Sequence, residues 1–268
     1  MIITFMSDFG TKDGYVGSVK GVLLKEAPDA RLIDITHEIQ PFNIKEAAYS
    51  LLNYYDSFPK GTVHLIVVDP GVGSERKPVI IRTLDYFFVG PDNGVFNFIL
   101  KREAYQAFEI RPEVVNPQSF SNTFHGRDIF APTAALLAKG IKPEEIAMPL
   151  ERVVIDDHQE LKLENNTCKA AVVSVDHFGN IIFALSREDL KHWKKVIKLV
   201  NFKNFKSDRI WDYYAQQKVG KPLVLWNSKN MLEIALSQGH AANYFKVDPK
   251  KDFALIELSD VTEKVENN

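Results

Sequence analysis

The sequence predicts two domains of different class: an N-terminal α/β domain with a mostly parallel sheet flanked by helices, and a C-terminal domain that is mainly antiparallel β. Two observations predict this division. Strand-like and helix-like segments alternate up to about residue 150, whereas short strands separated by turns dominate after it. A charged stretch lies between the two patterns. We therefore expect an α/β domain at residues 1–155, a linker at 156–166 and a β-rich domain at 167–268.

The first domain begins with a strand, a helix and a second strand. Residues 2–6 are mostly β-branched and aromatic, and residues 31–36 return to that pattern. Between them, residues 15–27 carry apolar side chains at helical spacing. A second helix is expected after Asn43, because this residue stands at capping-box spacing from Glu46 and precedes a single apolar stripe.

The rest of the first domain continues the alternation. Helices are expected near 94–103 and 126–139, and strands at 62–68, 78–84, 86–89 and 106–110. A parallel sheet that is covered on both faces binds its ligands beyond the carboxyl ends of its strands. The ends of these strands are therefore the expected place for a functional site.

The second domain is expected to contain short strands at 168–175, 180–185, 196–200, 223–226 and 253–258. Helical pattern is limited there to a capped start at Ser186 and Asp189 and to the region 232–245. The single cysteine, Cys168, lies in the first of these strands, and we expect it to be buried and chemically inert.

Composition excludes several classes of function. The chain has 33 basic and 35 acidic residues, so it lacks the positive charge that binding to a nucleic acid backbone requires. No run of about 18 apolar residues is present, and the N-terminus lacks the basic region of a secretory signal. We therefore expect a cytoplasmic protein that binds neither nucleic acid nor membrane.

Three segments of the first domain place charged side chains at strand or helix ends. Asp8 and Asp13 lie in the loop after the first strand, where turn formation and helix capping would explain them. A carboxylate such as Asp8 also suits the two hydroxyls of a ribose, because it offers two acceptor oxygens. Asp69 follows the most apolar strand and Arg76 closes its loop, although Asp-Pro-Gly alone is a common turn. His125 precedes the last predicted helix of the domain and has no evident structural role.

Two polar segments occur in the second domain. Asp176-His-Phe-Gly179-Asn180 joins two predicted strands, and a hairpin with Gly179 and Asn180 at positive φ would account for it. Asn227-Ser-Lys-Asn follows another predicted strand and indicates little by itself. The histidines other than His125 show no metal-ligand spacing, so we expect no metal and no cofactor.

Five motifs nevertheless occur in order along nearly the whole chain: Ser7-Asp8-Phe-Gly-Thr-Lys-Asp13, Asp69-Pro-Gly-Val-Gly, Thr123-Phe-His-Gly-Arg-Asp128, Asp176-His-Phe-Gly-Asn180 and Asn227-Ser-x-x-x-Leu-Glu-Ile-Ala235. Together they resemble the S-adenosylmethionine hydroxide adenosyltransferases, which are relatives of the fluorinases and chlorinases. The resemblance implies an N-terminal α/β domain and a C-terminal barrel-like β domain. It also implies a homotrimer whose sites lie between the first domain of one subunit and the second domain of its neighbour.

The resemblance implies that Asp69, Arg76 and His125 form a catalytic trio that handles water. It assigns further substrate contacts to Asp8 at the ribose, Phe42 and Tyr214 as stacking walls, Asp13 and Asp176 at the methionine end, Asn180 at the adenine, and Ser228 at the methionine carboxylate. The same loop departs from the family pattern, with Lys229 where arginine or serine is common and Asn230-Met231 where Gly-Tyr is usual. The halogenating relatives replace the aspartate and histidine of the trio, so the resemblance favours hydrolysis.

The implied activity is hydrolysis of S-adenosylmethionine to adenosine and methionine, by attack of an activated water on the ribose C5′ carbon. Two alternatives stay open from the residues themselves. The first is a metal-dependent phosphoesterase with ligands Asp8, Asp13, Asp69 and His125. The second is a sensor that binds adenosine or S-adenosylmethionine without turning it over.

Overall fold

The computed structural model describes residues 1–118, 120–155 and 161–261, and it divides into two compact units, Met1–Asp156 and Asp157–Asn268. The predicted linker at 156–166 lies partly outside the described residues. Its residues 161–164 form a strand, β8 (Leu161–Glu164), which pairs with the next strand of the second unit. The domain limits predicted from the sequence remain a prediction.

The first unit contains a seven-stranded sheet of order β2-β1-β3-β5-β4-β6-β7. Its strands are β1 (Ile2–Ser7), β2 (Arg31–Thr36), β3 (Val63–Val67), β4 (Pro78–Arg82), β5 (Phe87–Pro91), β6 (Gln106–Ile110) and β7 (Ala147–Leu150). Strands β2, β1, β3 and β5 are parallel neighbours, whereas the pairs β5-β4, β4-β6 and β6-β7 are antiparallel. The α/β class is confirmed, and the sheet is mixed where a mostly parallel one was predicted.

The turn between β4 and β5 explains the mixed sheet. Residues 83–86 join these two strands, and the Thr83 amide donates to the carbonyl of Tyr86 at 3.0 Å. A connection this short closes a hairpin, because a parallel crossover needs a dozen or more residues. The direction of β4 therefore reverses, and β6 and β7 extend the sheet in antiparallel pairs.

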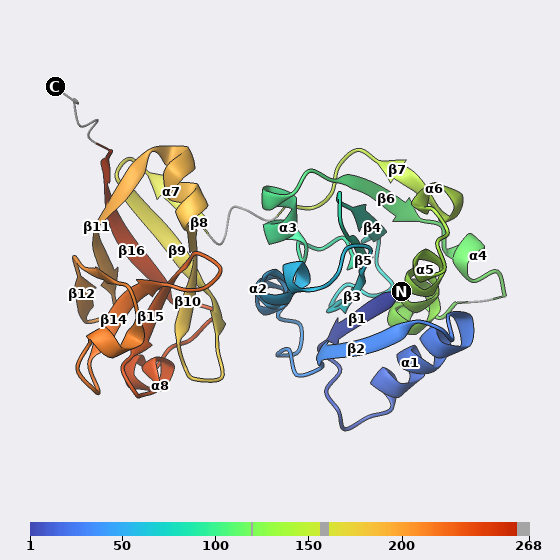
Figure 1. Cartoon of the computed structure of the whole chain (residues 1–268), viewed down its shortest axis with the longest axis horizontal. Helices are drawn as coiled ribbons and strands as arrows, with labels where there is room; N and C mark the ends of the chain where they lie inside the picture. Colours follow the sequence, from blue (N-terminus) through green and yellow to red (C-terminus); the bar gives the residue numbers. More distant parts are fainter. Residues whose placement is uncertain (119, 156–160, 262–268) are drawn as a thin grey trace. The chain divides into compact units, whose positions relative to one another are not determined.

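Helices cover both faces of this sheet (Figure 1). They are α1 (Tyr15–Glu26), α2 (Ile44–Tyr54), α3 (Asn97–Arg102), α4 (Pro112–Val115), α5 (Ala131–Ala138) and α6 (Pro143–Ile146). Val19 and Leu23 of α1 share one buried cluster with Leu137 of α5 and with Phe5 and Leu65 of the sheet. Side chains alternate along a strand, so the neighbouring His64 of β3 faces the other side, where the end of α2 packs on it.

The cap predicted for α2 is confirmed, because the side chain of Asn43 accepts a hydrogen bond from the amide of Glu46 at 3.2 Å. The predicted helix at 126–139 is also present, as a π-helical turn at Gly126–Phe130 that continues into α5. Asp13 does not cap α1. The N-cap residue of that helix is Gly14, and no side chain forms a capping bond there.

The second unit contains a strongly curved sheet of order β12-β11-β16-β9-β10-β15-β14-β13, with β8 paired to β9. Its strands beyond β8 are β9 (Thr167–Val175), β10 (Ile181–Ser186), β11 (Lys195–Phe202), β12 (Phe205–Ser207), β13 (Ile210–Trp211), β14 (Pro222–Trp226), β15 (Met231–Leu236) and β16 (Phe253–Asp260). All pairs except β13-β14 are antiparallel. The predicted antiparallel, barrel-like domain is confirmed.

Two helices accompany this sheet, α7 (Arg187–Trp193) and α8 (Ala241–Phe245). Ser186 and Asp189 form the predicted capping box of α7. The helical prediction for 232–245 is correct for α8 but wrong for residues 232–236, which belong to β15. Cys168 is fully buried as predicted, and burial raises the pKa of its thiol to about 12. No helix in the described ranges has the length and apolar character needed to cross a membrane.

Candidate active site

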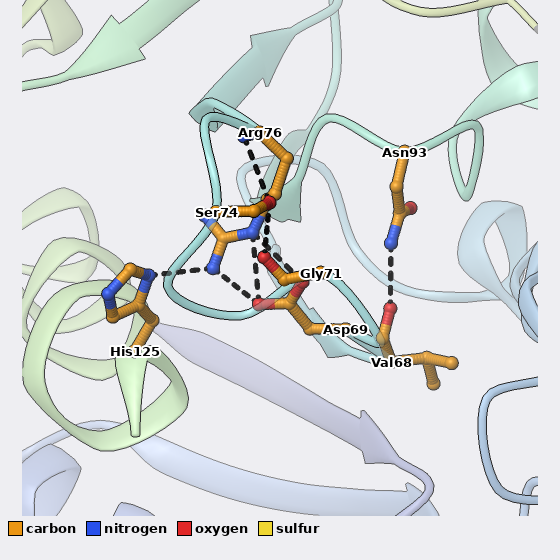
Figure 2. A network of polar contacts seen from close by, with 7 residues as sticks. All are labelled: Val68, Asp69, Gly71, Ser74, Arg76, Asn93 and His125. Carbon is orange, nitrogen blue, oxygen red and sulfur yellow. Dashed lines mark hydrogen bonds and ion pairs between the residues drawn. The ribbon is translucent and has the colours of Figure 1, made fainter. Parts of the chain in front are cut away.

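The carboxyl ends of the parallel strands meet at one edge of the first sheet. Asp8 directly follows β1, and Asp69 and Asn93 lie two residues past the ends of β3 and β5, respectively. The side-chain amide of Asn93 donates to the carbonyl of Val68 at 2.9 Å, which ties the ends of β5 and β3 together (Figure 2). The expectation that polar residues gather at the strand ends is therefore confirmed for this edge.

The loop after β3 folds back so that its last residue reaches its first. The Val72 amide donates to the carbonyl of Asp69, and the hydroxyl of Ser74 donates to the carbonyl of Gly71 at 2.7 Å. Gly73 has a φ of +78°, and a Cβ atom there would lie 2.5 Å from the carbonyl oxygen of Asn122. Only glycine fits this position without displacing the backbone, so the loop can close and direct Arg76 toward Asp69.

Asp69 and Arg76 form a buried, two-pronged ion pair. Nε of Arg76 donates to Oδ1 and Oδ2 of Asp69 at 2.9 and 3.0 Å, and Nη2 also donates to Oδ2. The two side chains are 6% and 8% exposed, respectively, and the guanidinium lies 5.1 Å from the ring centroid of Phe130. Bidentate geometry of this kind fixes the orientation of a carboxylate as well as pairing its charge.

His125 lies on the other side of the same guanidinium (Figure 2), with its Nδ1 atom 2.7 Å from Nη2 of Arg76. A guanidinium only donates, so Nδ1 of His125 accepts and the ring proton of the neutral imidazole resides on Nε2. Burial lowers the pKa of His125, and the positive charge of Arg76 lowers it further, against the opposing effect of Asp69 and Asp128. His125 is therefore neutral at neutral pH.

A π-helical turn places this histidine. His125 is the N-cap residue of the segment Gly126–Phe130, and turns of this kind occur frequently at functional sites. A Cβ atom on Gly126 would lie 3.0 Å from Cγ1 of Val67 and 3.3 Å from the ring of Phe9. The missing side chain lets the turn approach β3 closely, and this approach brings His125 within reach of the Asp69 loop.

Asp8 also belongs to the site. The backbone amide of Phe42 donates to Oδ2 of Asp8 at 2.9 Å. Burial raises the pKa of the Asp8 carboxyl above its ordinary value, the amide of Phe42 opposes this, and the nearby charge of Asp69 adds to it. Phe42 itself has a φ of +68° and is 71% exposed, so a large apolar ring stands in solvent on a strained backbone.

Asp8, Phe42, Asp69 and His125 line one pocket of about 260 Å³. Its polar lining includes Asp8, Asp69 and His125, and its apolar lining includes Phe9, Tyr15, Pro41, Phe42, Val67, Val72 and Phe124. Phe124 packs edge-on against Phe9 and Tyr15, whose own rings are tilted to each other, and the ring centroids lie 5.4 to 6.0 Å apart. Sequence reasoning singled out the polar residues and Phe42 but missed the apolar wall, although most of that wall lies within or beside the same motifs.

Of the first-domain candidates, Arg76 and Asp13 are not part of the pocket lining, but Arg76 bonds to two lining residues, Asp69 and His125. Asp13 is exposed in the turn before α1 and lies apart from the pocket lining. Among the described residues, no group of three or more histidine, cysteine or acidic side chains has an arrangement suited to a metal ion. Both oxygens of Asp69 instead receive hydrogen bonds from a cation, which leaves a poor ligand set for a metal.

The second unit brings Asp176 and Asn180 together in the hairpin between β9 and β10. The backbone amide and the side-chain amide of Asn180 donate to the two carboxylate oxygens of Asp176, at 2.8 and 2.9 Å. Gly179 has a φ of +84°, whereas Asn180 is not among the residues with positive φ, so one of the two predicted positions is confirmed. Asn180 is 7% exposed, and these two hydrogen bonds tie it to Asp176.

A second polar cluster of this unit centres on a residue that sequence reasoning did not select. Glu233 of β15 is 2% exposed, and its Oε1 accepts a hydrogen bond from the hydroxyl of Tyr214 at 2.8 Å. Burial raises the pKa of Glu233 to about 7, and the charge of Asp176 adds to the rise, while hydrogen bonds from Tyr214 and Asn227 oppose it. An acid in the middle of the apolar run Met231–Leu236 was the available signal.

The Asn227 loop carries the two remaining predicted residues. Oδ1 of Asn227 accepts from the amides of Lys229 and Met231 at 3.0 and 3.1 Å, which defines the turn between β14 and β15. Ser228 is exposed at the tip of this turn and Lys229 is half-buried beside it. The structure thus groups the second-domain candidates into the Asp176 hairpin and the Glu233 cluster.

Comparison with known proteins gives matches along most of the chain. The model of the SAM hydroxide adenosyltransferase N-terminal domain matches residues 3–147, and that of the C-terminal domain matches residues 170–254. The chain is 36% identical, over an alignment of 270 residues, to an (R)-S-adenosyl-L-methionine hydrolase from Methanocaldococcus jannaschii, with 95% of each chain covered. It is 28% identical over 218 residues to a fluorinase from Nocardia brasiliensis, covering 71% of this chain and 73% of that one. A crystal structure of a conserved protein from Thermotoga maritima is similar with a TM-score of 0.82 at 34% identity, covering 95% of this chain and 99% of that one.

Proposed function

The chain belongs to the SAM hydroxide adenosyltransferase family, and on that premise we propose that it hydrolyses S-adenosyl-L-methionine to adenosine and L-methionine. The resemblance inferred from five short motifs is thereby confirmed, including the relation to the fluorinases. The observation that supports the proposed roles is that Arg76 joins Asp69 to His125, two residues that line the first-unit pocket.

The reaction needs a positioned nucleophile more than it needs an acid. The oxygen of water attacks C5′ of the ribose, the C5′–S bond breaks, and its electron pair goes to sulfur. The positively charged sulfonium thereby becomes the neutral thioether of methionine, so the leaving group requires no proton. Positive charge moves instead to the attacking water, which releases one proton as adenosine forms. A group that accepts hydrogen from that water therefore stabilises the transition state.

Asp69 is the acceptor that suits this step. A guanidinium holds its carboxylate in one orientation, and the residue lines the pocket. His125 is less suited to accept the proton, because its Nδ1 atom already accepts from Arg76 and its Nε2 carries hydrogen. In this proposal, Asp69 accepts a hydrogen from water, His125 fixes the water oxygen through Nε2–H, and Arg76 orients both side chains. Positioning of this kind lowers a barrier by several kcal/mol.

The remaining pocket residues suit the nucleoside. Asp8 offers carboxylate oxygens to the ribose hydroxyls, and the exposed ring of Phe42 offers a stacking face beside it. In the second unit we propose contacts from Asn180 to the adenine and from Asp176 to the methionine end. Tyr214 would be the second stacking wall, and Ser228 and Lys229 would meet the methionine carboxylate. Asp13 is proposed at the methionine end on the family resemblance.

We propose in addition that the protein is a homotrimer with sites completed by a neighbouring subunit. The first-unit pocket of about 260 Å³ is smaller than the ~300–1,000 Å³ that bury a drug-sized ligand. The proposed adenine and carboxylate contacts all belong to the second unit. In this proposal the substrate contacts both units, and the family resemblance supports supply of the second one by a neighbour. A cytoplasmic location also stays a prediction.

The test is turnover in oxygen-18 water. Purified protein is incubated with S-adenosylmethionine and a chelator, and the products are analysed by mass spectrometry. Adenosine that carries the heavy oxygen, in equal amount to methionine, is the expected result. Intact substrate despite tight adenosine binding would favour the sensor, and activity that requires restored divalent metal would favour the metal-dependent phosphoesterase.

A further inference from the structure

Glu233 is an unusual residue for its position. It lies in β15 between Leu232 and Ile234, and both of these pack in the main buried cluster of the second unit. Side chains alternate along a strand, so Glu233 faces the other side of the sheet together with Ala235. That face of the sheet is nevertheless covered at Glu233, since only 2% of this residue is exposed. The carboxyl group is thus covered by neighbouring side chains and does not extend into solvent.

The groups that cover this carboxyl come from segments to which substrate contacts are assigned above. The hydroxyl of Tyr214 donates to Oε1 of Glu233 at 2.8 Å, while the Tyr214 residue as a whole stays 44% exposed. The side chain of Asn227 also donates a hydrogen bond to Glu233. Asp176 lies close enough for its charge to act on Glu233. One buried acid is therefore hydrogen-bonded to two surface segments and lies near a third.

Asn227 transmits this contact to a loop. Its Oδ1 accepts from the amides of Lys229 and Met231, so its side chain joins the turn backbone on one side to Glu233 on the other. Tyr214 is held directly, because the hydrogen bond from its hydroxyl to Glu233 fixes the position of its ring. Removal of the carboxyl would release the tyrosine ring and one anchor of the turn at once.

Stability alone does not account for an acid at this place. A buried carboxyl loses its hydration, which costs free energy, and replacement of a buried polar pair by apolar groups of the same shape is often nearly neutral or stabilising. The flanking residues of β15 and the facing Leu225 of β14 are apolar, so an apolar residue at 233 would suit the strand. The retained carboxyl instead keeps an exposed tyrosine and a polar turn in fixed positions.

We propose that Glu233 is a positioning residue for substrate binding, which holds the Tyr214 ring and the Asn227 turn in the orientation that S-adenosylmethionine requires. This inference rests on the proposed function and deepens it. Glu233 acts through the two residues that it holds, and it touches neither the water nor the C5′ carbon. Its loss therefore weakens substrate binding and leaves the chemical step unchanged.

The test compares Glu233→Ala, Glu233→Gln and Tyr214→Phe by steady-state kinetics with S-adenosylmethionine. Glu233→Ala is expected to raise KM about tenfold or more with kcat within about threefold, since a hydrogen bond to a buried acid is lost. Glu233→Gln keeps an acceptor for the tyrosine hydroxyl and is expected to restore KM to within about threefold of the parent value. Tyr214→Phe removes the same hydrogen bond without touching the buried position, and its KM is expected to rise about threefold or more.

Leu225→Ala is the matched control, because it removes a buried side chain directly opposite Glu233 without touching a polar contact. It is expected to lower the melting temperature while KM stays unchanged. A KM for Glu233→Ala equal to that of Leu225→Ala overturns the inference, and if Glu233→Ala does not fold, an unchanged KM for Tyr214→Phe overturns it. Absence of turnover by the parent protein would instead refute the proposed function, so the two failures are distinguishable.

Discussion

Nδ1 of His125 lies 2.7 Å from Nη2 of Arg76, a group that can only donate hydrogen bonds. The contact therefore requires an unprotonated Nδ1, which leaves the ring proton of the neutral imidazole on Nε2. A second proton on Nδ1 would place two donors against each other beside a permanent positive charge. The pair therefore determines the tautomer of the histidine, and the charge of Arg76 adds to the burial that lowers the pKa of His125.

The pH dependence of catalysis follows from this pair. Burial and the charge of Arg76 hold the pKa of His125 below its ordinary value of 6.5, so the neutral form persists to lower pH. If catalysis requires neutral His125, activity is present above this lowered pKa and is lost as the pH falls through it. A pH profile of kcat/KM is expected to show an acidic limb below pH 6.5. The control His192→Asn changes an exposed histidine of α7 and is expected to leave the limb unchanged, whereas a limb at or above pH 6.5 contradicts the proposed state.

Asp69→Asn is expected to abolish most turnover while nucleoside binding persists. The substitution preserves shape but removes the acceptor for the proton of water, so kcat is expected to fall by about 10²–10⁴. Adenosine affinity, measured by titration calorimetry, is expected to change by less than about threefold. Asp85→Asn is the control, since Asp85 pairs with exposed Lys60 at a hairpin turn. Loss of adenosine binding in the Asp69 variant would contradict the role given to Asp69.

Gly126→Ala and Gly21→Ala are expected to act in opposite directions. A Cβ atom at Gly126 would lie 3.0 Å from Val67 and 3.3 Å from Phe9, so the π-helical turn must shift away from β3. We expect a loss of about 1–3 kcal/mol in unfolding free energy and a lower kcat, because His125 moves with the turn. Gly21 lies in α1 with open space around it, and alanine there is expected to stabilise by about 0.5–1 kcal/mol. Urea unfolding and kinetics on both variants check this, and unchanged kcat in Gly126→Ala would refute the positional argument.

Acid sensitivity of the fold is expected to depend on His64. This residue is fully buried, and its Nδ1 pairs with the hydroxyl of Thr4 at 2.8 Å. Burial lowers the pKa of His64 to about 3, whereas its value in the unfolded chain is about 6.5. Below pH 6.5 the unfolded chain binds the proton and the folded one does not, so stability falls as the pH drops toward 3.

At pH 5 this difference amounts to about 2 kcal/mol, from the 1.5 units between pH 5 and the unfolded value. His64→Phe suits the aromatic surroundings of Phe58, Tyr86 and Phe88 and removes the titration. Unfolding free energies at pH 7 and pH 5 are expected to differ by about 2 kcal/mol less in this variant than in the parent protein. An equal pH dependence in both proteins would mean that His64 is not the responsible group.

The proposed trimer predicts complementation between two inactive variants. Asp69→Asn disables the first unit, and Ser228→Ala combined with Tyr214→Ala disables the second. If each site joins the first unit of one subunit to the second unit of its neighbour, co-expressed subunits regain about a quarter of parental activity through random assembly. Light scattering is expected to give three times the chain mass of 30.5 kDa. No recovered activity in mixed trimers would place each site within one subunit.

Several features of the fold could be predicted because they depend on local sequence. The Asn43 and Ser186 caps require only a side chain and an amide three residues away, and both are present. The direction of β4 could not be predicted from its composition, since a buried strand has the same apolar pattern in either pairing. The short turn at residues 83–86 determined the antiparallel direction of β4, and the length of this turn was the signal that the sequence offered.

The site shows the same division. The positions of Asp69 and Asp8 at strand ends were predictable, because parallel neighbours end at one edge of a sheet. The conformation of Met231–Leu236 was not, since a short apolar run fits a buried helix or a strand equally well. Because a helix was predicted for this segment, the strand alternation that places Glu233 on the opposite face from Leu232 and Ile234 could not be recognised.

By itself the sequence determined the two domain classes, the family resemblance and the identity of the polar residues, because these depend on residue type and order along the chain. Only the tertiary structure decided the tautomer of His125, the burial of Glu233 and the separation of Asp13 from the pocket. Each of these depends on which side chains from distant segments come within hydrogen-bond distance or exclude water from one another. Such contacts follow from packing, and local pattern does not specify them.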